Sequence, residues 1–214
     1  MLDLSPSVLI SRILTLIIAF TLHEFAHGRV ADMFGDDTPR LAGRLTLNPL
    51  KHLDPIGTLM LILVGFGWAK PVPINPDIIR RRSRAGVMLV SLAGPFTNLL
   101  LALAASVPFQ LNLVSPYSTA TGILPTMDEF LLEFVFINVA LFLFNLLPLA
   151  PLDGEKVVEY LLPDSFQPTF NKIRQFGPFL LLALVFIGPQ IGFDLFGIIF
   201  QQPLLNITRF LVGL

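Results

Sequence analysis

The sequence predicts an all-α polytopic membrane protein, with four to five transmembrane helices and a short re-entrant loop or β-hairpin between the first two. Hydrophobic residues make up 54% of the 214 residues, charged residues only 14%, and the mean hydropathy is +0.75. A soluble domain carries about 25% charged residues, so this deficit favours a membrane protein. Several apolar runs also reach the roughly 20 residues that a transmembrane helix needs.

Four segments are expected to cross the bilayer: residues 8–31, 86–109, 130–147 and 176–200. Arg12 lies near one end of the first, where a long side chain can reach the interface. The last segment is interrupted by "IGPQIGFD". We interpret it as one span followed by an interfacial helix at 203–214, or as two short spans. Together these segments form one membrane-embedded domain over residues 1–214.

Residues 54–72 connect the first two clear spans and are expected to re-enter the membrane. Their apolar core is too short for an upright transmembrane helix, and it contains Gly57, Gly65 and Gly67. Basic residues flank both ends, so the segment should enter and leave on the same face. Irregular backbone at membrane depth is tolerated only against protein or a water-filled cavity. The segment is therefore expected to pack near a functional site.

The distribution of Lys and Arg predicts the orientation. None occurs from residue 85 to 155, whereas "RRRSR" at 80–84 precedes this stretch and Lys156, Lys172 and Arg174 follow it. Because basic loops remain on the cytoplasmic side, residues 110–127 should be extracytosolic and His27 should face the cytoplasm. The expected location is the plasma membrane, multi-pass, with the active site toward the cytoplasmic side.

Composition excludes several other functions. The net charge of −1 provides no basic surface for nucleic acid. The chain has no cysteine, which excludes disulfides, thiolate metal sites and cysteine nucleophiles. The first apolar run is expected to be retained rather than cleaved, because Asp3 precedes any positive charge and no small-residue cleavage pattern follows.

The stretch "TLHEFAHGRV" places two of the three histidines and a glutamate in the first predicted span. On a helix, His23 and His27 share one face because they are about one turn apart, so both can bind one metal ion. Glu24 flanks that face, as in the zincin helix, whose glutamate is a general base. Ionisable residues inside a span are costly and usually functional. The pattern predicts a Zn2+ site rather than histidines that serve packing alone.

A catalytic zinc needs a third protein ligand and an open position. Asp153 is favoured, because prolines in "NLLPLAPLDGEK" break the third span at its cytoplasmic end. His52 and Asp54 remain open on spacing alone, whereas Asp128 and Glu129 are expected on the opposite side of the membrane. The acidic and histidine candidates near spans are His52, Asp54, Asp128, Glu129, Asp153, Glu155 and Asp194.

Asparagines in the spans suggest further roles. Asn145 and Asn138 could each hydrogen-bond the oxyanion of a tetrahedral intermediate, or form an interhelical hydrogen bond. The residues alone do not separate these alternatives. In "AGPFTN", we expect a packing role for Gly94 and a structural or substrate-facing role for Asn98.

These motifs resemble the site-2 protease family of intramembrane zinc metalloproteases, in its compact prokaryotic form. The similarity rests on "HEFAHGRVAD", "GDDTPRLAGRLTLNPLKHLDPIGT", "GWAKPVPINP", "SLAGPFTNLLLA" and "FNLLPLAPLDGEK". It implies that zinc is bound by His23, His27 and Asp153. It also implies that Glu24 activates water and that Asn145 assists at the transition state or binds the substrate strand. One departure is Glu155, which follows Gly154 where many members have a second glycine.

The expected function is hydrolysis of a peptide bond within or near a transmembrane segment of a single-span membrane protein. The partners are then that substrate and the lipid bilayer, with no nucleic acid. A metal or ion transporter that uses the same His/His/Asp cluster is the alternative. Against it, Glu24 has no necessary role in transport, and the inverted repeats common in transporters are not visible. A catalytically inactive scaffold is disfavoured by the intact Glu24.

Overall fold

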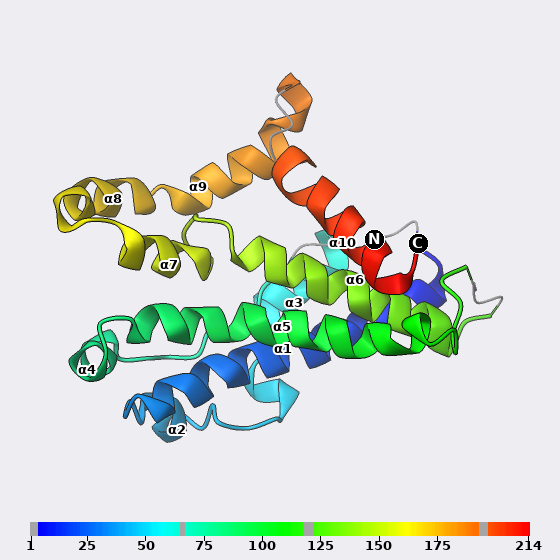
Figure 1. Ribbon diagram of the computed structural model, residues 1–214, viewed down its shortest axis with the longest axis horizontal. Helices are drawn as coiled ribbons and strands as arrows, with labels where there is room; N and C mark the ends of the chain where they lie inside the picture. Colours follow the sequence, from blue (N-terminus) through cyan, green and yellow to red (C-terminus); the bar gives the residue numbers. More distant parts are fainter. Residues whose placement is uncertain (1–3, 65–66, 118–121, 193–196) are drawn as a thin grey trace.

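The computed structural model describes residues 4–64, 67–117, 122–192 and 197–214 (Figure 1). The described residues are mostly helical and contain no β-strand beyond one isolated antiparallel bridge, Leu53 with Ala69. The predicted all-α class is therefore confirmed. The main helices are α1 (Pro6–Met33), α2 (Thr38–Leu41), α3 (Pro55–Val64), α4 (Pro76–Arg82), α5 (Gly86–Gln110), α6 (Met127–Asn145), α7 (Gly154–Leu161), α8 (Gln167–Arg174), α9 (Gly177–Leu182) and α10 (Gln202–Val212).

Helices α1, α5 and α6 form the central bundle, and each packs against the other two. Within the described part of the chain, α1 and α5 are the two helices that are long and apolar enough to cross a membrane. Their bounds agree with the predicted spans 8–31 and 86–109. Helix α6 corresponds to the third predicted span and begins at an N-cap, where the Thr126 hydroxyl accepts the Glu129 N–H. It ends three residues before Pro148, since a residue that precedes proline is disfavoured in a helix.

The face of α1 toward the bundle carries small side chains. Ser7, Ser11, Thr15 and Ala19 are spaced by four residues and are fully buried. Small residues allow helix backbones to approach closely within a membrane. The same row continues to His23, so the packing of α1 against α5 and α6 also determines where the histidine side chains lie.

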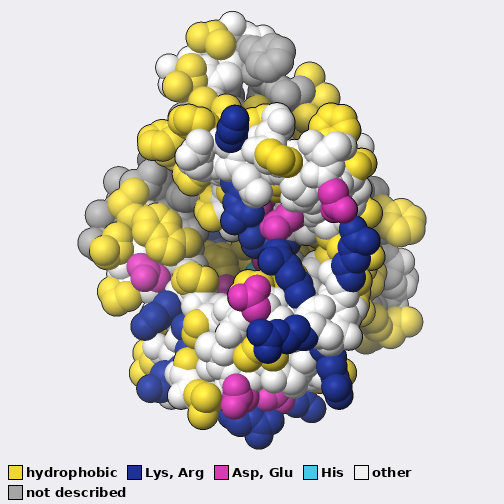
Figure 2. All heavy atoms as spheres, turned by 90° about the vertical axis from the view of Figure 1, so that its left-hand side faces the viewer, with side chains coloured by type: hydrophobic (Ala, Val, Ile, Leu, Met, Phe, Trp, Pro, Cys, Tyr) yellow, Lys and Arg dark blue, Asp and Glu magenta, His cyan; other side chains and the backbone are white. Residues whose placement is uncertain are grey.

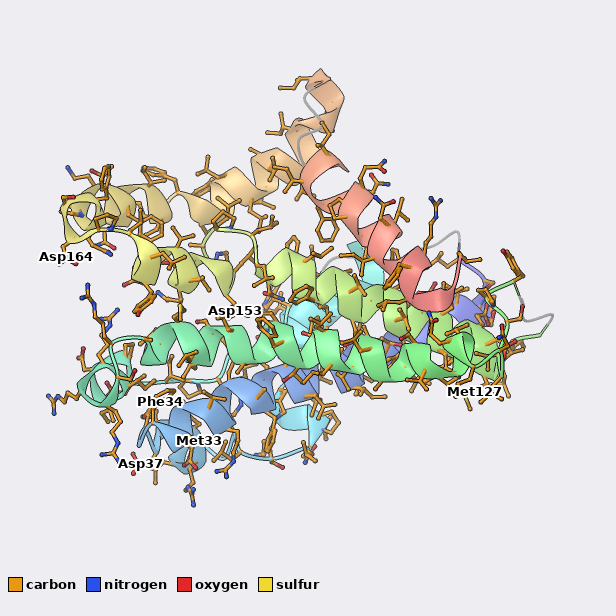
Figure 3. The ribbon with its side chains drawn as sticks, viewed as in Figure 1. Met33, Phe34, Asp37, Met127, Asp153 and Asp164 are labelled. Carbon is orange, nitrogen blue, oxygen red and sulfur yellow. The ribbon has the colours of Figure 1, made fainter. Side chains whose placement is uncertain are left out.

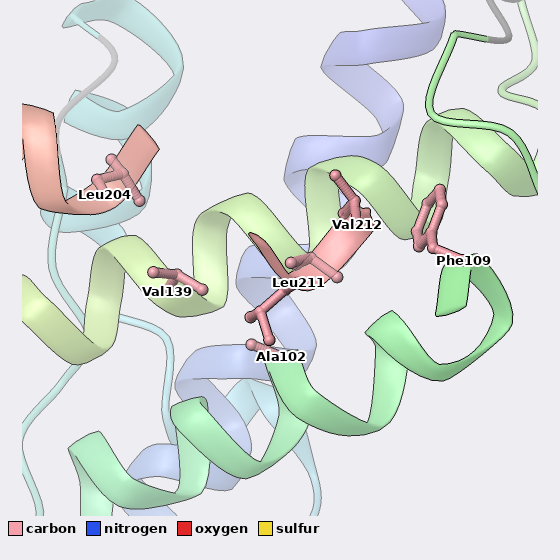
Figure 4. Close-up of a cluster of buried hydrophobic side chains, with 7 residues drawn as sticks. Ala102, Phe109, Val139, Leu204, Leu211 and Val212 are labelled. Atoms are coloured by element: carbon pink, nitrogen blue, oxygen red, sulfur yellow. The ribbon is translucent and has the colours of Figure 1, made fainter. Parts of the chain in front are cut away.

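The fourth predicted span, 176–200, is not one regular helix in the described residues. Helix α9 is followed by a π-helical stretch (Ala183–Ile187), a 3₁₀ turn (Pro189–Ile191) and a second π-helical stretch (Gly197–Gln201). The helix expected at 203–214 is present as α10. One face of α10 packs on α5 and α6 in an apolar cluster (Figure 4), formed by Ala102, Phe109, Val135, Val139, Leu204, Leu211 and Val212.

The segment predicted to re-enter the membrane contains helix α3 and an extended return. The chain comes back beside its own start, where the Lys70 N–H donates to the His52 carbonyl at 2.8 Å next to the Leu53–Ala69 bridge. Among the described residues, the β-hairpin alternative is thus reduced to this single bridge. Residues 70–75 then continue without regular structure toward α4.

Basic side chains gather at the end of the molecule that carries α4 and the α7–α8 connection. Figure 2 shows this face, which is hollowed between Lys and Arg side chains. A cavity of about 380 Å³ opens there between α4, α5 and α7, lined in part by Arg80, Arg84, Lys156 and Glu159.

Candidate metal centre and active site

Three potential metal ligands from two distant parts of the chain meet at one point. The Nε2 atoms of His23 and His27 are 2.9 Å apart, and Asp153 Oδ2 lies 3.2 Å and 3.3 Å from them. Both histidines are buried in the middle of the bundle. In the part of the chain that the structure describes, this is the one group of three His, Cys, Asp or Glu side chains arranged to hold a metal ion.

Asp153 reaches this point because α6 ends before the proline-rich turn and α7 begins beside α5 (Figure 3). The residue occupies the N-cap position of α7, where an aspartate commonly caps the helix. Its side chain makes no capping hydrogen bond and lies against the histidines instead. The buried Oδ2 atom has no hydrogen-bond donor.

The other ring nitrogens are bound away from the cluster. His27 Nδ1 donates to the Val90 carbonyl oxygen at 2.7 Å, and His23 Nδ1 lies 2.6 Å from Asn98 Oδ1. A carbonyl oxygen only accepts, so His27 carries its proton on Nδ1 and presents the Nε2 lone pair to the cluster. Such partners of the second nitrogen are typical of histidines that bind metal.

The arrangement fits zinc. Zinc–nitrogen and zinc–oxygen bonds of about 2.0–2.1 Å in a tetrahedral site place ligand atoms about 3.3 Å apart, close to the separations here. Two imidazoles and a carboxylate suit zinc, and three protein ligands leave one position open, as in catalytic sites. Gly94 of α5 faces the cluster, and a Cβ at this position would collide with Nε2 of both His23 and His27. The absence of a side chain at Gly94 keeps this space clear.

Glu24 borders the same space. Its side chain is buried, and Oε2 accepts the main-chain N–H of Val72 at 2.8 Å. A cavity of about 490 Å³ extends from the three ligands and Glu24 between α1, α6, α9 and the extended segment. Its wall is mostly apolar and includes Phe20, Trp68, Val72, Leu141, Phe144, Leu181 and Leu182.

Comparison with known proteins decides the family. A model of peptidase family M50 matches residues 111–188. The chain is 40% identical over 203 residues to YwhC of Bacillus subtilis, which is named as a zinc metalloprotease, and the match covers 92% of this chain and 86% of YwhC. The chain belongs to peptidase family M50, the site-2 proteases.

Two further relatives are the Rip2 proteins of Mycolicibacterium smegmatis and Mycobacterium tuberculosis strain H37Rv, which are also named as zinc metalloproteases. Each is 31% identical to this M50 peptidase. The matches cover 82% and 86% of this chain, and 66% and 69% of the two relatives. No solved structure matches the chain.

The M50 peptidase keeps its other ligand candidates away from the cluster. His52 is fully buried and its Nε2 donates to the Thr46 carbonyl at 2.8 Å, while Asp54 Oδ1 accepts the Gly57 N–H at the start of α3. Glu155 is ion-paired with Lys156 and Arg174. Asp128 and Glu129 lie at the start of α6, and Asp194 lies outside the described residues.

The asparagines of α5 and α6 separate into two kinds. Asn145 lines the cavity, and its Nδ2 donates to the Leu141 carbonyl at 3.0 Å. Asn138 and Asn98 are fully buried behind the histidines and do not line the cavity. An oxyanion role is therefore compatible with the position of Asn145 but not with that of Asn138.

Sequence reasoning missed the residues that hold the extended segment over the site. The buried Arg44 guanidinium donates to the carbonyls of Lys70 and Pro71. Burial lowers the pKa of Arg44, whereas the nearby Glu24 carboxylate raises it. The buried Asp36 carboxylate accepts the Asn75 N–H at 2.6 Å. The sequence signal for these two residues is their place in "GDDTPRLAGR", a polar stretch that contributed to the family resemblance. No role was predicted for that stretch.

Proposed function

We propose that this protein cleaves a peptide bond within or beside a transmembrane segment of another membrane protein. Membership of family M50 and the His/His/Asp cluster make it a zinc metalloprotease. In the proposed site, His23, His27 and Asp153 are the zinc ligands and Glu24 is the general base. The supporting observation is the meeting of the three ligand atoms on the cavity that Glu24 also lines. Family membership also disfavours the metal or ion transporter.

The side chains of the cavity have complementary roles in hydrolysis. When bound, zinc would act as a Lewis acid that polarises the scissile carbonyl and lowers the pKa of its bound water. Glu24 removes the proton of the attacking water and delivers it to the leaving amine. Asn145, which also lines the cavity, hydrogen-bonds the developing oxyanion in exchange for its bond to the Leu141 carbonyl.

The proposed substrate is a single-span membrane protein, bound in an extended conformation. A helix hides its carbonyl groups in hydrogen bonds, so the scissile region has to unwind. Most residues of the extended segment from Gly67 to Ile74 line the cavity, and its backbone groups that are not engaged by His52, Arg44 and Glu24 are the proposed partners of an extended substrate peptide. The apolar wall around Phe20, Leu141 and Phe144 favours large apolar side chains next to the cleaved bond.

The proposed location is the plasma membrane, with four to five spans and the site toward the cytoplasm. Two long apolar helices support membrane insertion, and α5 exposes Leu89, Phe96, Leu100, Leu103 and Val107 on its outer side. The basic face of Figure 2 supports the orientation, because Arg80, Arg84 and Lys156 line one hollow at the end of the molecule where α1 terminates, the end nearer His27. In this arrangement, α3 and its extended return re-enter the membrane from the cytoplasmic side.

The test compares zinc content and cleavage in matched variants. Purified native protein, Glu24→Gln and Asp153→Ala are assayed with a single-span model substrate in detergent and in vesicles. Glu24→Gln should keep one zinc per chain and lose cleavage by about 10²–10⁴-fold, since it removes the base alone. Asp153→Ala should lose both the bound zinc and the cleavage activity. Full cleavage by Glu24→Gln would refute the base, and native zinc affinity in Asp153→Ala would refute the ligand set.

A further inference from the structure

A chain of hydrogen bonds behind the metal cluster joins three helices. From α1, His23 Nδ1 lies 2.6 Å from Oδ1 of Asn98 on α5. Asn98 Nδ2 donates to Oδ1 of Asn138 on α6 at 2.9 Å, and Asn138 Nδ2 donates to the Phe134 carbonyl at 2.9 Å. Both amides are fully buried, so their hydrogen-bonding groups depend on these partners.

The direction of this chain follows from its last member. The Phe134 carbonyl can only accept, so the amide nitrogen of Asn138 must point to it and Oδ1 must point to Asn98. Because Asn138 Oδ1 is an acceptor, the group of Asn98 that faces it must be the Nδ2 donor. The Oδ1 atom of Asn98 then faces His23. His23 must then donate from Nδ1. The main chain of α6 thereby selects the tautomer of His23 that leaves Nε2 free.

The two histidines are held by different means. His27 Nδ1 binds a main-chain carbonyl, that of Val90, which no side-chain substitution removes. His23 depends on two side chains that can be replaced. The two amides lie outside the cavity lining, so their substitution alters the histidine without altering the cavity wall.

We propose that Asn98 and Asn138 are positioning residues of the metal centre, which hold His23 in the Nδ1-protonated form with Nε2 directed at the metal. This inference rests on the proposed zinc ligands. An interhelical contact alone would account for the bond between the two asparagines. Such an interhelical contact would not require the hydrogen-bond chain to end on Nδ1 of His23, the ring nitrogen opposite the proposed metal-binding Nε2. The end of the chain at His23 distinguishes a positioning role from a purely structural one.

The test measures zinc affinity of the full-length protein in detergent by competition with a chelating dye. Asn98→Leu should weaken zinc binding by about 10- to 100-fold, the range found for removal of partners of metal-bound histidines. Asn98→Asp should bind zinc more tightly than Asn98→Leu, because a carboxylate still accepts the His23 N–H, although it can no longer donate to Asn138 Oδ1. Asn138→Leu should weaken binding by a smaller factor, since Asn98 remains but is no longer oriented.

Two further measurements separate positioning from stability. The visible absorption spectrum of the Co2+-substituted protein should change more in Asn98→Leu than in Asn98→Asp. The control is Thr97→Val on the same helix, whose hydroxyl donates only to the Ala93 carbonyl of α5. It should leave affinity and spectrum unchanged.

The outcomes distinguish this inference from the proposed function. Native zinc affinity in His23→Ala would refute the metal site itself. Loss of zinc in His23→Ala, together with affinity within twofold of native in both leucine variants, would refute only the positioning role. If the leucine variants do not fold, Asn98→Ala and Asn138→Ala replace them. Failure of all four to fold, with Thr97→Val folded, would assign the asparagines to folding and overturn the proposal.

Discussion

The main-chain N–H of Val72 donates a 2.8 Å hydrogen bond to Oε2 of Glu24, so the segment that crosses the cavity is tied to the proposed general base. Val72 lies between Pro71 and Pro73, which have no N–H, and it is the one residue of this tripeptide that can donate. The position of the segment is set in turn by Arg44, which binds the two preceding carbonyl groups. Arg44 is therefore connected to the proposed base through the backbone of residues 70–72.

Replacement of Arg44 should reduce activity without removing zinc. Arg44→Gln removes charge-assisted hydrogen bonds to Lys70 and Pro71, so the segment can shift against Glu24. We expect kcat/KM to fall by about tenfold or more, because small displacements of catalytic groups are costly. Arg44→Lys should keep only part of the native kcat/KM, since an ammonium group does not reproduce the paired hydrogen bonds of the guanidinium group. Initial rates and zinc content are measured together, with the exposed Lys51→Gln as control. Unchanged kinetics in Arg44→Gln would show that the segment is held by other contacts.

Gly94→Ala should impair the metal centre. The added methyl group would overlap with Nε2 of His23 and His27, and both are confined by their other hydrogen bonds. We expect zinc affinity and cleavage each to fall by about tenfold or more, as for other disturbances of metal-ligand orientation. Gly122→Ala is the matched control, since a Cβ there meets nothing within 4 Å. Native zinc affinity in Gly94→Ala would indicate that α5 can move away from α1.

Removal of the metal should abolish cleavage reversibly. Asp153 Oδ2 is buried beside two imidazoles without a hydrogen-bond donor, and the metal is the partner that we propose for it. A chelator should therefore stop cleavage and lower the thermal stability, and stoichiometric zinc should restore both. Differential scanning fluorimetry and cleavage assays follow the cycle. His52→Ala should show the same zinc dependence as the native protein, because His52 lies outside the cluster. Activity that survives complete zinc removal would contradict the assignment.

The ion pair between Arg12 and Glu133 should stabilise the contact of α1 with α6. The Arg12 Nε–Glu133 Oε2 distance is 2.8 Å, and both side chains are partly buried. Arg12→Leu and Glu133→Leu should each lower the free energy of unfolding by about 1–3 kcal/mol, because each leaves one charge unpaired. The loss of unfolding free energy in the double variant should be smaller than the sum of the two single losses, with a coupling energy of about 1 kcal/mol. Unfolding in mixed micelles measures all four proteins. Additive losses would show that the charges act independently.

Local patterns predicted much of the fold and of the site. The apolar runs predicted α1, α5 and α6 because helix length and hydropathy are properties of contiguous residues. The separation of His23 and His27 by four residues predicted a shared face for the same reason. The fourth span was the weakest prediction. Gly188, Pro189 and Gly192 interrupt the apolar pattern of this segment, and the described chain there consists of short helical pieces.

Spacing along the chain could not choose between Asp153, His52 and Asp54 as partners of the histidines, and it left open whether Asn98 has a structural or a substrate-facing role. Those answers came from the packing of α1 against α5 and α6 and from the turn before α7, which bring together residues 40 to 130 positions apart. The sequence could predict metal-dependent chemistry because the residues of HExxH lie within about one helical turn. Which carboxylate completes the metal site, and which amides and backbone groups orient its ligands, depended on contacts between segments that no local pattern records.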